Sequence, residues 1–402
     1  MLELDVDTEC PPPFGLFARN QLFFLSEEIT FANHGSFGTV ARPVMELQRR
    51  LHDTTETCPE EWFRITSYPL WLESCQTVAE FVGTTAENVV LVDNATTAVN
   101  CVLKSLRFTK NDAILVSDHT YGAVEYTALA VSDITEAAVV THVFPFPIES
   151  VEQFVGSFEA ALRADPRIRI AIIDHICSVS ALLLPVRRLI DICRSRNVLV
   201  LVDGAHAPGQ VPIDLTYLDP DYYTGNFHKW VYAPRGCCVL YINPKHHDKI
   251  NPLVTSWYWK KSLHERFYQQ ATRDITSWLC AKPAIQFYRW LGGMEKITAY
   301  NSSLSQWASA LLASKWKTAE QQIPAEMRAP NMSVIALPSN IGYDNTAADA
   351  DRLMKDIAKK HKVWVAMTCF SNRLWCRISS QVYNVRDDYE RVAEAVLDMM
   401  KH

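Results

Sequence analysis

The sequence predicts an α/β protein in which helices cover both faces of a mostly parallel sheet, followed by a smaller α+β domain. Between about residues 85 and 245, short and almost continuously apolar runs alternate with longer amphipathic stretches. Strands that are buried on both faces have such runs, and helices connect neighbouring parallel strands. Beyond about residue 265 the order changes, because one long helical stretch precedes a group of short strands. The 402 residues suffice for one large or two medium domains.

Each expected element follows from its residue pattern. Apolar runs rich in β-branched residues predict strands at 89–92, 113–117, 139–144, 168–174, 198–203 and 237–242. The amphipathic spacers between them predict helices at 96–106, 151–164 and 186–196. The C-terminal part is expected to hold a long helix at 289–317, short strands at 333–337, 363–367 and 374–379, and a closing helix at 386–400. We therefore expect an N-terminal arm (1–30), a large domain (31–264) and a small C-terminal domain (265–402).

Composition and charge exclude several kinds of partner. Apolar residues make up 48% of the chain and charged residues 21%, which is typical of a globular protein. The 39 Lys and Arg against 45 Asp and Glu give a net charge of -6, so we expect no basic surface for nucleic acid or an anionic membrane. No apolar run is long enough to cross a bilayer, and the acidic N-terminus does not resemble a signal peptide.

The 11 cysteines indicate a reducing compartment. They form no CxxC pair and have no regular spacing, so neither a disulfide scaffold nor a metal site is expected. Most lie in apolar runs, where a cysteine acts as a small buried hydrophobic residue. We therefore expect a cytoplasmic protein that acts on a small molecule.

Two polar segments follow apolar strands, at the places where an open α/β sheet binds its ligands. One apolar strand ends in Asp203, and His206 follows three residues later. A second segment contains Asn226, His228 and Lys229. A lysine that can form a Schiff base and a carboxylate that keeps a pyridine nitrogen protonated are what a pyridoxal phosphate enzyme requires. Taken singly, Asp203 could be a turn residue and Lys229 a solvated surface group, so their combination carries the hypothesis.

Further motifs extend along nearly the whole chain. They are Asn33-His-Gly-Ser-Phe-Gly38, Asp203-Gly-Ala-His-Ala207, Asn226-Phe-His-Lys-Trp230, Ala271-Thr-Arg-Asp274 and Cys376-Arg-Ile-Ser379. In this order the motifs resemble those of the class V aminotransferase-like enzymes, which are pyridoxal phosphate enzymes of fold type I. Within that family they are most similar to the isopenicillin N epimerase-like and cysteine-conjugate C–S lyase branch. The resemblance implies pyridoxal 5'-phosphate as the cofactor, an amino acid as the substrate and a homodimer as the assembly.

The resemblance also implies roles for residues around the cofactor. Lys229 would hold it as a Schiff base and would move the Cα proton of the substrate. Asp203 would pair with the pyridine nitrogen, and His206 would lie near the phenolic oxygen of the ring. The phosphate group would be held by Asn94, Ala95, Thr96, Asn226 and His228, with Thr272 or Thr276 reaching it across a dimer interface.

Aromatic residues near position 120 are candidates for contact with the cofactor ring. By the resemblance, His119 is predicted to stack on the ring, and Tyr121 is the alternative. Tyr121 is also a candidate proton donor to a leaving group, and an equally good candidate for simple core packing.

Three arginines and two entrance residues are expected on the substrate side. Arg377 resembles the family arginine that binds the substrate α-carboxylate with both arms of its guanidinium. Asn33 and His34 are expected to line the entrance. Arg64 and Arg235 are weaker candidates for polar contacts with the substrate.

The reaction is decided by positioning, because the same cofactor supports several chemistries. We predict β-elimination at the C–S bond of a cysteine-derived substrate, such as an S-conjugate or a sulfoxide. An epimerase would need a second proton donor, for which Tyr121 and His34 are candidates. A cysteine desulfurase would need a thiol on a mobile loop, but the pattern around Cys369 predicts a tight hairpin. Transamination also stays open.

Two hypotheses of other kinds are kept. The chain could be a catalytically silent scaffold, although the intact set of Asp203, His206, Lys229 and Arg377 argues against that. It could also be a sulfur carrier that acts through Cys369 without the cofactor. Substitution of Cys369 without loss of activity would remove the second hypothesis.

Overall fold

The computed structural model describes residues 1–4 and 10–400, and its largest element is a sheet of seven strands. The strands are β2 (Val89–Val92), β3 (Ala113–Ser117), β4 (Ala138–His142), β5 (Ile168–Asp174), β6 (Leu199–Asp203), β7 (Tyr222–Asn226) and β8 (Cys238–Ile242). Their spatial order is β2-β8-β7-β6-β5-β3-β4. Strand β8 is antiparallel to both of its neighbours, and the other pairs are parallel. The predicted α/β architecture is confirmed, with β7 added to the six expected strands.

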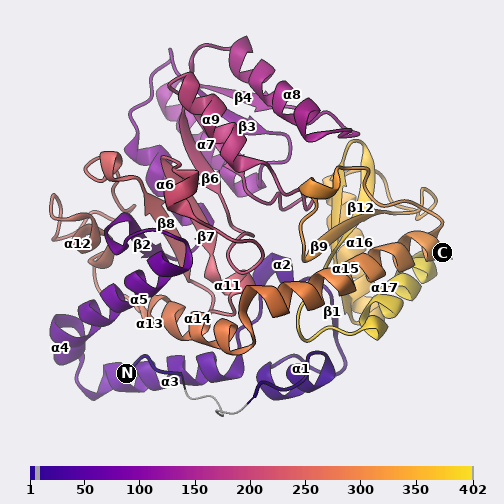
Figure 1. Ribbon diagram of the computed structural model, residues 1–402, viewed down its shortest axis with the longest axis horizontal. Helices are drawn as coiled ribbons and strands as arrows, with labels where there is room; N and C mark the ends of the chain where they lie inside the picture. The colour runs from indigo at the N-terminus through magenta and orange to yellow at the C-terminus, as the bar shows by residue number, and fades with distance from the viewer. Residues whose placement is uncertain (5–9, 401–402) are drawn as a thin grey trace.

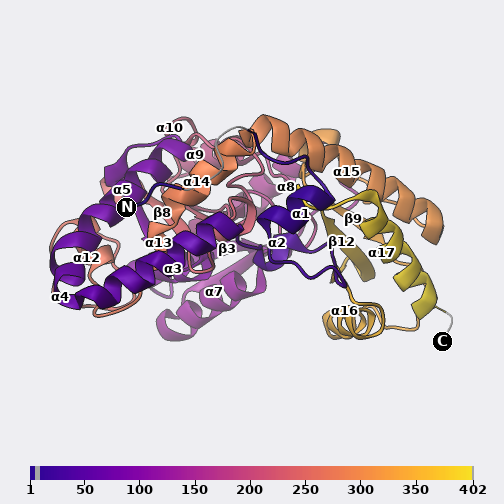
Figure 2. The same cartoon turned by 90° about the horizontal axis from the view of Figure 1, so that it is seen from below.

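Helices cover both faces of this sheet. The helices α6 (Ala95–Ser105) and α7 (Gly122–Thr135) lie on one face. The opposite face carries α8 (Val151–Ala164), α9 (Val186–Ser195) and the short α10 (Leu215–Leu218). In Figure 2, α7 lies below the sheet, and α9 and α10 lie above it. The three helices expected between the strands are therefore present, because each has an apolar stripe to bury against the sheet.

The remaining helices of this part lie beyond the β2 edge of the sheet, in the lower left of Figure 1. They are α3 (Arg42–Thr57), α4 (Pro59–Glu61), a π-helical turn (Trp62–Thr66), α5 (Ser67–Phe81), α12 (Leu263–Tyr268), α13 (Thr276–Leu279) and α14 (Ala281–Trp290). Closer to the sheet's carboxyl edge are two one-turn helices, α2 (His34–Phe37) and α11 (Phe227–Trp230). The arm contributes α1 (Leu16–Leu22), and short 3-10 turns lie at Ala86–Asn88, Pro244–His246 and Ala325–Met327.

The C-terminal part is a second α+β unit, to the right in Figure 1. Its antiparallel sheet has the order β11 (Ala366–Phe370), β12 (Arg373–Ser379) and β9 (Met332–Ala336). The helices α15 (Gly293–Trp316), α16 (Ala347–His361) and α17 (Arg386–Met399) pack with it. Strand β1 (Thr30–Phe31) pairs in parallel with β10 (Val363–Trp364), which joins the segment at the end of the N-terminal arm to the C-terminal part.

Two expected elements are each divided in the structure. The helix expected at 289–317 is interrupted between α14 and α15, where Gly292 and Gly293 have φ values of 107° and 65°. A left-handed backbone ends an α-helix, and glycine adopts it without strain. The strand expected at 363–367 is divided at Val365, since β10 pairs with β1 whereas β11 pairs with β12.

Buried apolar residues form two clusters. The larger one fills the space around the seven-stranded sheet and includes Ile297 of α15. The second begins at Leu304 of the same helix and continues to Val396 of α17, with Ala32 added from the N-terminal side. Helix α15 thus spans both clusters, and the domain limits expected at 31–264 and 265–402 stay a prediction. Among the described residues, no helix is both long enough and apolar enough to cross a membrane.

Candidate active site

A cavity of about 500 Å³ lies at the carboxyl ends of the parallel strands. Asp174, Asp203 and Asn226 are the last residues of β5, β6 and β7, and all three line it. The other lining residues are Ser36, Phe37, Asn94, Ala95, Thr96, Thr97, Tyr121, Val124, Ile176, Ser178, Ala205, His206, His228 and Lys229. The geometry thus agrees with the rule that ligands of open α/β sheets bind beyond the carboxyl ends of the strands.

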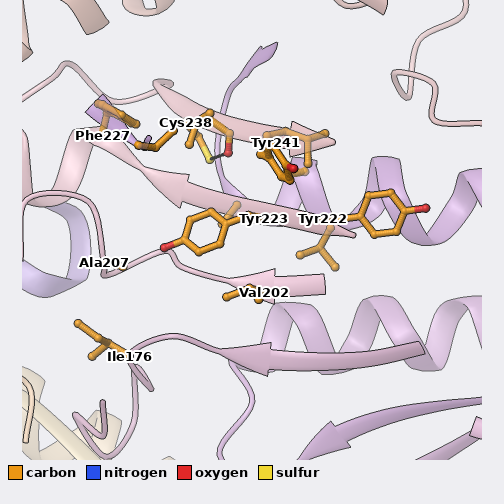
Figure 3. Packing of buried hydrophobic residues seen from close by; sticks show 14 of the residues in the cluster. Ile176, Val202, Ala207, Tyr222, Tyr223, Phe227, Cys238 and Tyr241 are labelled. Carbon is orange, nitrogen blue, oxygen red and sulfur yellow. Dashed lines mark hydrogen bonds between the residues drawn. The ribbon is translucent and has the colours of Figure 1, made fainter. Parts of the chain in front are cut away.

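The turn after β6 is shaped by the packing beneath it. Figure 3 shows Tyr223 turned toward Ala207, whereas Tyr222 points the other way, as successive residues of a strand do. The hydroxyl of Tyr223 lies 2.9 Å from His175 Nδ1. A Cβ atom at Gly204 would lie 2.2 Å from that hydroxyl, so the residue after Asp203 must be glycine.

Two carboxyl groups lie at the bottom of the cavity. Asp174 and Asp203 are paired in register on neighbouring parallel strands, and each is 4% exposed. Burial raises the pKa of Asp203, while the main-chain amide of Ala205 and the amine of Lys229 act in the opposite direction. The pKa of Asp174 is raised well above its usual value, first by burial and then by Asp203. Asp203 is therefore the more acidic of the two.

Sequence reasoning missed Asp174. Its signal was the same as that of Asp203, because both close a buried strand of apolar residues. Ser36, Phe37 and Thr97 lie within segments that the sequence singled out but were given no roles of their own, and Ser178 was missed.

Lys229 lies on the one-turn helix α11, which directly follows β7. Its Nζ atom is 3.1 Å from Nε2 of His206. Burial lowers the pKa of Lys229 to about 8, and the charge of Arg377 acts in the same direction. Burial also holds the pKa of His206 well below its usual value, so this ring is neutral at neutral pH. A buried amine with a lowered pKa is a suitable nucleophile and base.

The N-terminus of α6 forms a polar cradle at one end of the cavity. The side chain of Asn94 caps this helix, since its Oδ1 accepts from the amide of Thr97 at 2.9 Å. Oδ1 of Asn226 accepts from the amide of Ala95 at 3.0 Å. Together with Thr96, these residues bring main-chain and hydroxyl donors and the positive end of a helix dipole to the cavity.

Arg377 lies on β12 behind the serines that line the cavity. Its Nη1 atom donates to the carbonyl of Ser178 at 2.6 Å, and its Nη2 atom donates to Asn33 Oδ1 and Ser36 Oγ, each at 3.0 Å. The side chain is buried, and within the described ranges no carboxylate lies within 4.0 Å of its guanidinium. Burial lowers its pKa to about 10, which still leaves it charged. A buried cation without an anion is suited to bind an anionic ligand.

His34 does not line the cavity, which corrects its expected place at the entrance. The side chain is fully buried. Its Nδ1 atom is 2.8 Å from the hydroxyl of Tyr383, and its Nε2 atom is 2.6 Å from the carbonyl of Lys229. Both ring nitrogens are thus engaged, so His34 cannot exchange a proton with a ligand in the cavity. Asn33 likewise holds Arg377 through its side chain.

The structure favours Tyr121 over His119 as the aromatic residue at the cavity. A ring that stacks on a ligand must present a face to it, but His119 is 1% exposed and does not line the cavity. Its ring stacks on Phe144 at 4.7 Å and also contacts Phe370 at 5.1 Å. Tyr121 is 49% exposed and lines the cavity, just before α7.

Four further candidates lie outside the cavity. Thr276 is buried, and its hydroxyl accepts from Gln48 Nε2 at 3.1 Å; its role across an interface stays a prediction. Thr272 is exposed, and its role stays a prediction. Arg64 is exposed, does not line the cavity, and pairs with Glu60. Arg235 is exposed, with Nη2 3.3 Å from the carbonyl of Gly38.

Comparison with known proteins finds one matching family and several similar enzymes. The model of the family described as "Aminotransferase class-V" matches residues 71–392. The chain is 30% identical to the L-cysteine desulfhydrase of Arabidopsis thaliana, over all of this chain and 92% of that protein. It is 26% identical to the hercynylcysteine sulfoxide lyase of Schizosaccharomyces pombe, over 94% of this chain and 95% of the other.

Two further matches complete the comparison. The isopenicillin N epimerase of Amycolatopsis lactamdurans is 28% identical over 96% of this chain and 98% of its own length. Among solved structures, the cystine C–S lyase C-DES in complex with cysteine persulfide matches with a TM-score of 0.78 and 18% identity. That match covers 92% of this chain and 98% of C-DES, and it supports the fold.

Proposed function

Because the chain belongs to the class V aminotransferase family, we propose that it is a pyridoxal 5'-phosphate-dependent lyase. Its reaction is β-elimination at the C–S bond of L-cysteine or of a cysteine-derived amino acid. The relatives named as an L-cysteine desulfhydrase and a hercynylcysteine sulfoxide lyase support this substrate class.

The residues around the cavity fit the cofactor. The half-buried amine of Lys229 would be the attachment point, and the carboxyl group of Asp203 would be the partner for the pyridine nitrogen. The cradle formed by Asn94, Thr96 and Asn226 receives the phosphate group. When bound, pyridoxal phosphate draws electrons away from the substrate Cα atom, which makes the Cα proton acidic.

The chain's own residues then bind the substrate and move protons. Arg377 binds the α-carboxylate, in place of the neutral oxygens of Asn33 and Ser36 that it now contacts. Lys229 Nζ takes the Cα proton. The electron pair left on Cα forms a Cα–Cβ double bond while the electrons of the Cβ–S bond leave with sulfur. Tyr121 donates the proton that the departing sulfur needs. The three-carbon product is hydrolysed by water to pyruvate and ammonia.

The place of Cys369 within a hairpin is the observation that favours elimination over desulfuration. An epimerase needs two proton-exchanging groups. Because both nitrogens of His34 are engaged away from the cavity, Tyr121 is the candidate for the second group, and the products formed separate epimerisation from elimination. A desulfurase needs a mobile thiol, but Cys369 is paired in register with Leu374 within a hairpin. The hairpin turns through two residues, Ser371 and Asn372, whose φ values of 48° and 54° are those of a tight turn.

The decisive experiment measures products from a panel of substrates. The protein loaded with cofactor is incubated with free L-cysteine, S-substituted L-cysteines and their sulfoxides, and pyruvate, thiol, alanine and D-amino acid are quantified. Lys229→Ala is the blank, and Lys110→Ala, which removes an exposed lysine, is the matched control. We expect pyruvate in equal amount with the eliminated sulfur product, which is hydrogen sulfide from L-cysteine, a thiol from an S-substituted cysteine and a sulfenic acid from a sulfoxide. Both products should be absent from the blank and unchanged in the control.

Each other product would replace the proposal with a named alternative. Alanine without pyruvate would establish a desulfurase, and a D-amino acid without pyruvate would establish an epimerase. A protein that binds no cofactor at Lys229 would instead be a silent scaffold.

We also propose a homodimer in a reducing compartment, the cytoplasm. The segment with Trp257 (91% exposed) and Trp259 (49% exposed) supports a covered interface, because large aromatic side chains are enriched in such contacts. All eleven cysteines are free, which is typical of a reducing compartment. Analytical ultracentrifugation tests the dimer, and a monomer at micromolar concentration would refute it.

A further inference from the structure

The segment formed by residues 33–38 joins the two groups that would hold cofactor and substrate. Its side chains of Asn33 and Ser36 accept from the guanidinium of Arg377. Its His34 contacts the main chain of Lys229, 195 positions away along the sequence. The mechanism proposed above uses Arg377 and Lys229 but gives His34 no part.

The carbonyl group of Lys229 needs a donor from outside its own helix. Helix α11 has one turn, and the last carbonyls of a helix have no donor within it. The amides of Val231 and Ala233, which follow the turn, both donate to the carbonyl of Phe227 instead. The carbonyl of Lys229 accepts from His34 Nε2, at 2.6 Å.

The hydrogen bonds of His34 fix which of its nitrogens carries the proton. A carbonyl oxygen can only accept, so Nε2 must be the protonated nitrogen. Nδ1 is then the acceptor for the hydroxyl of Tyr383, at 2.8 Å. Burial lowers the pKa of His34 to about 3, which keeps the ring neutral and this arrangement intact. Two hydrogen bonds with fixed donors therefore link Tyr383 to His34 and His34 to the carbonyl of Lys229.

Close packing holds the same turn on two other sides. A Cβ atom at Gly38 would lie 1.9 Å from the carbonyl oxygen of His228, and one at Gly209 would lie 2.5 Å from that of Trp230. The ring of His34 also packs at 4.9 Å from that of Trp230. The main chain on both sides of Lys229 is thus confined, and His34 supplies the hydrogen bond at the lysine itself.

We propose that His34 is a positioning residue for Lys229: its Nε2–H group holds the main chain of the lysine so that Nζ points toward His206 and the cavity. Tyr383 acts through His34 by selecting its tautomer. The inference rests on the part of the proposed function that attaches the cofactor to Lys229, and it is independent of whether the enzyme then eliminates, epimerises or transaminates.

The test follows attachment of the cofactor rather than turnover. Apo-protein is mixed with pyridoxal phosphate, Nζ adds to its aldehyde with loss of one water, and visible absorbance gives the rate constant. Borohydride trapping and mass spectrometry identify Lys229 as the modified residue. The variants are His34→Ala, which removes both hydrogen bonds, and His34→Gln, whose amide nitrogen can replace Nε2.

Two more variants separate positioning from general stability. Tyr383→Phe removes the hydroxyl that sets the tautomer. His246→Gln is the matched control, because His246 is a buried histidine whose Nε2 atom is 2.8 Å from Asp221 Oδ1, away from Lys229. Thermal unfolding of all four variants is measured in parallel.

We expect His34→Ala to slow attachment by about tenfold, His34→Gln to restore it to within about threefold of the parent, and Tyr383→Phe to lie between them. His246→Gln should lower the melting temperature without slowing attachment. The inference is wrong if His34→Ala attaches the cofactor at the parent rate, or if the control slows it equally. If His34→Ala does not fold, the other two variants decide. The inference is then wrong if Tyr383→Phe attaches the cofactor at the parent rate while a folded His34→Gln attaches it slowly. A parent protein that does not attach the cofactor at all would refute the proposed function instead.

Discussion

Asp174 and Asp203 lie directly opposite each other at the carboxyl ends of two neighbouring parallel strands, and both carboxyl groups are buried at one cavity. Two buried carboxylates so close cannot both be ionised without a large cost. The main-chain amide of Ala205 and the amine of Lys229 favour the ionised form of Asp203. Asp174 is thus the member that carries the proton.

Amide substitutions should separate the two aspartates. Asp174→Asn replaces a neutral acid with a neutral amide of the same shape, so we expect turnover and cofactor affinity to stay within about threefold of the parent. Asp203→Asn removes the charge that faces the cofactor, so we expect turnover to fall by about 10- to 100-fold, the effect of one charge-assisted hydrogen bond. Steady-state kinetics and cofactor titration measure both. Equal losses in the two variants would contradict the assignment.

Arg377→Lys should weaken substrate binding more than it slows turnover. Lysine keeps the charge but cannot form two parallel hydrogen bonds to a carboxylate. We expect KM to rise by about 10- to 100-fold, corresponding to about 1.5–3 kcal/mol of lost charged hydrogen bonding. Arg373→Lys, on the same strand but exposed, is the control and should leave KM unchanged. An unaltered KM in Arg377→Lys would exclude carboxylate binding by this residue.

Tyr121→Phe should slow substrates with poor leaving groups the most. If the hydroxyl of Tyr121 donates a proton to the departing sulfur, its loss matters more as the pKa of the free thiol rises. We expect turnover to fall by about 100-fold for alkyl thiols, the usual effect of a general acid, and by less for aryl thiols. His119→Asn is the comparison and should change thermal stability only. A uniform loss across leaving groups would argue for ring stacking by Tyr121 without proton donation.

Cys369→Ser should retain full activity. Cys369 lies within a hairpin strand and is absent from the residues that line the cavity. Burial raises the pKa of its thiol, which reduces its nucleophilicity at neutral pH. We expect product formation within twofold of the parent for every substrate. Loss of activity with free cysteine alone would revive the desulfurase and sulfur-carrier hypotheses.

Buried histidines should make the protein sensitive to mild acid. Burial lowers the pKa of His142 and of His175 from 6.5 to about 4. Between these pH values the unfolded chain binds more protons at these two positions than the folded one, so their contribution to the free energy of unfolding falls as the pH falls from about 6.5 to about 4. Each such group contributes a slope of up to about 1.4 kcal/mol per pH unit. Urea unfolding across this range measures it.

A single substitution checks that slope. His142→Gln keeps a donor for Ser157, whose hydroxyl lies 2.9 Å from His142 Nε2 in the parent, but removes one titrating group. The slope of the unfolding free energy against pH should be smaller in the variant, by up to about 1.4 kcal/mol per pH unit, because one titrating group is lost. The same pH dependence in parent and variant would show that His142 does not titrate as expected.

The sequence by itself determined the sheet and the edge at which the site lies. Apolar runs that alternate with amphipathic spacers can bury both faces only as parallel strands between helices. Since the carboxyl ends of parallel strands meet at one edge, Asp203 and the segment of Lys229 had to come together there, as they do. Asn94 was assigned from the sequence to the phosphate group, and the structure adds that its side chain caps α6.

Only the tertiary structure decided the direction and burial of individual side chains. From the sequence, His34 was expected to line the entrance. In the structure its Nε2 atom instead donates to the carbonyl of Lys229, which is 195 positions away along the chain. Tyr121 rather than His119 faces the cavity, because Phe144 and Phe370 enclose the histidine ring. Such contacts join segments that are distant in sequence, and their energies depend on solvent exclusion, which no local pattern of residues encodes.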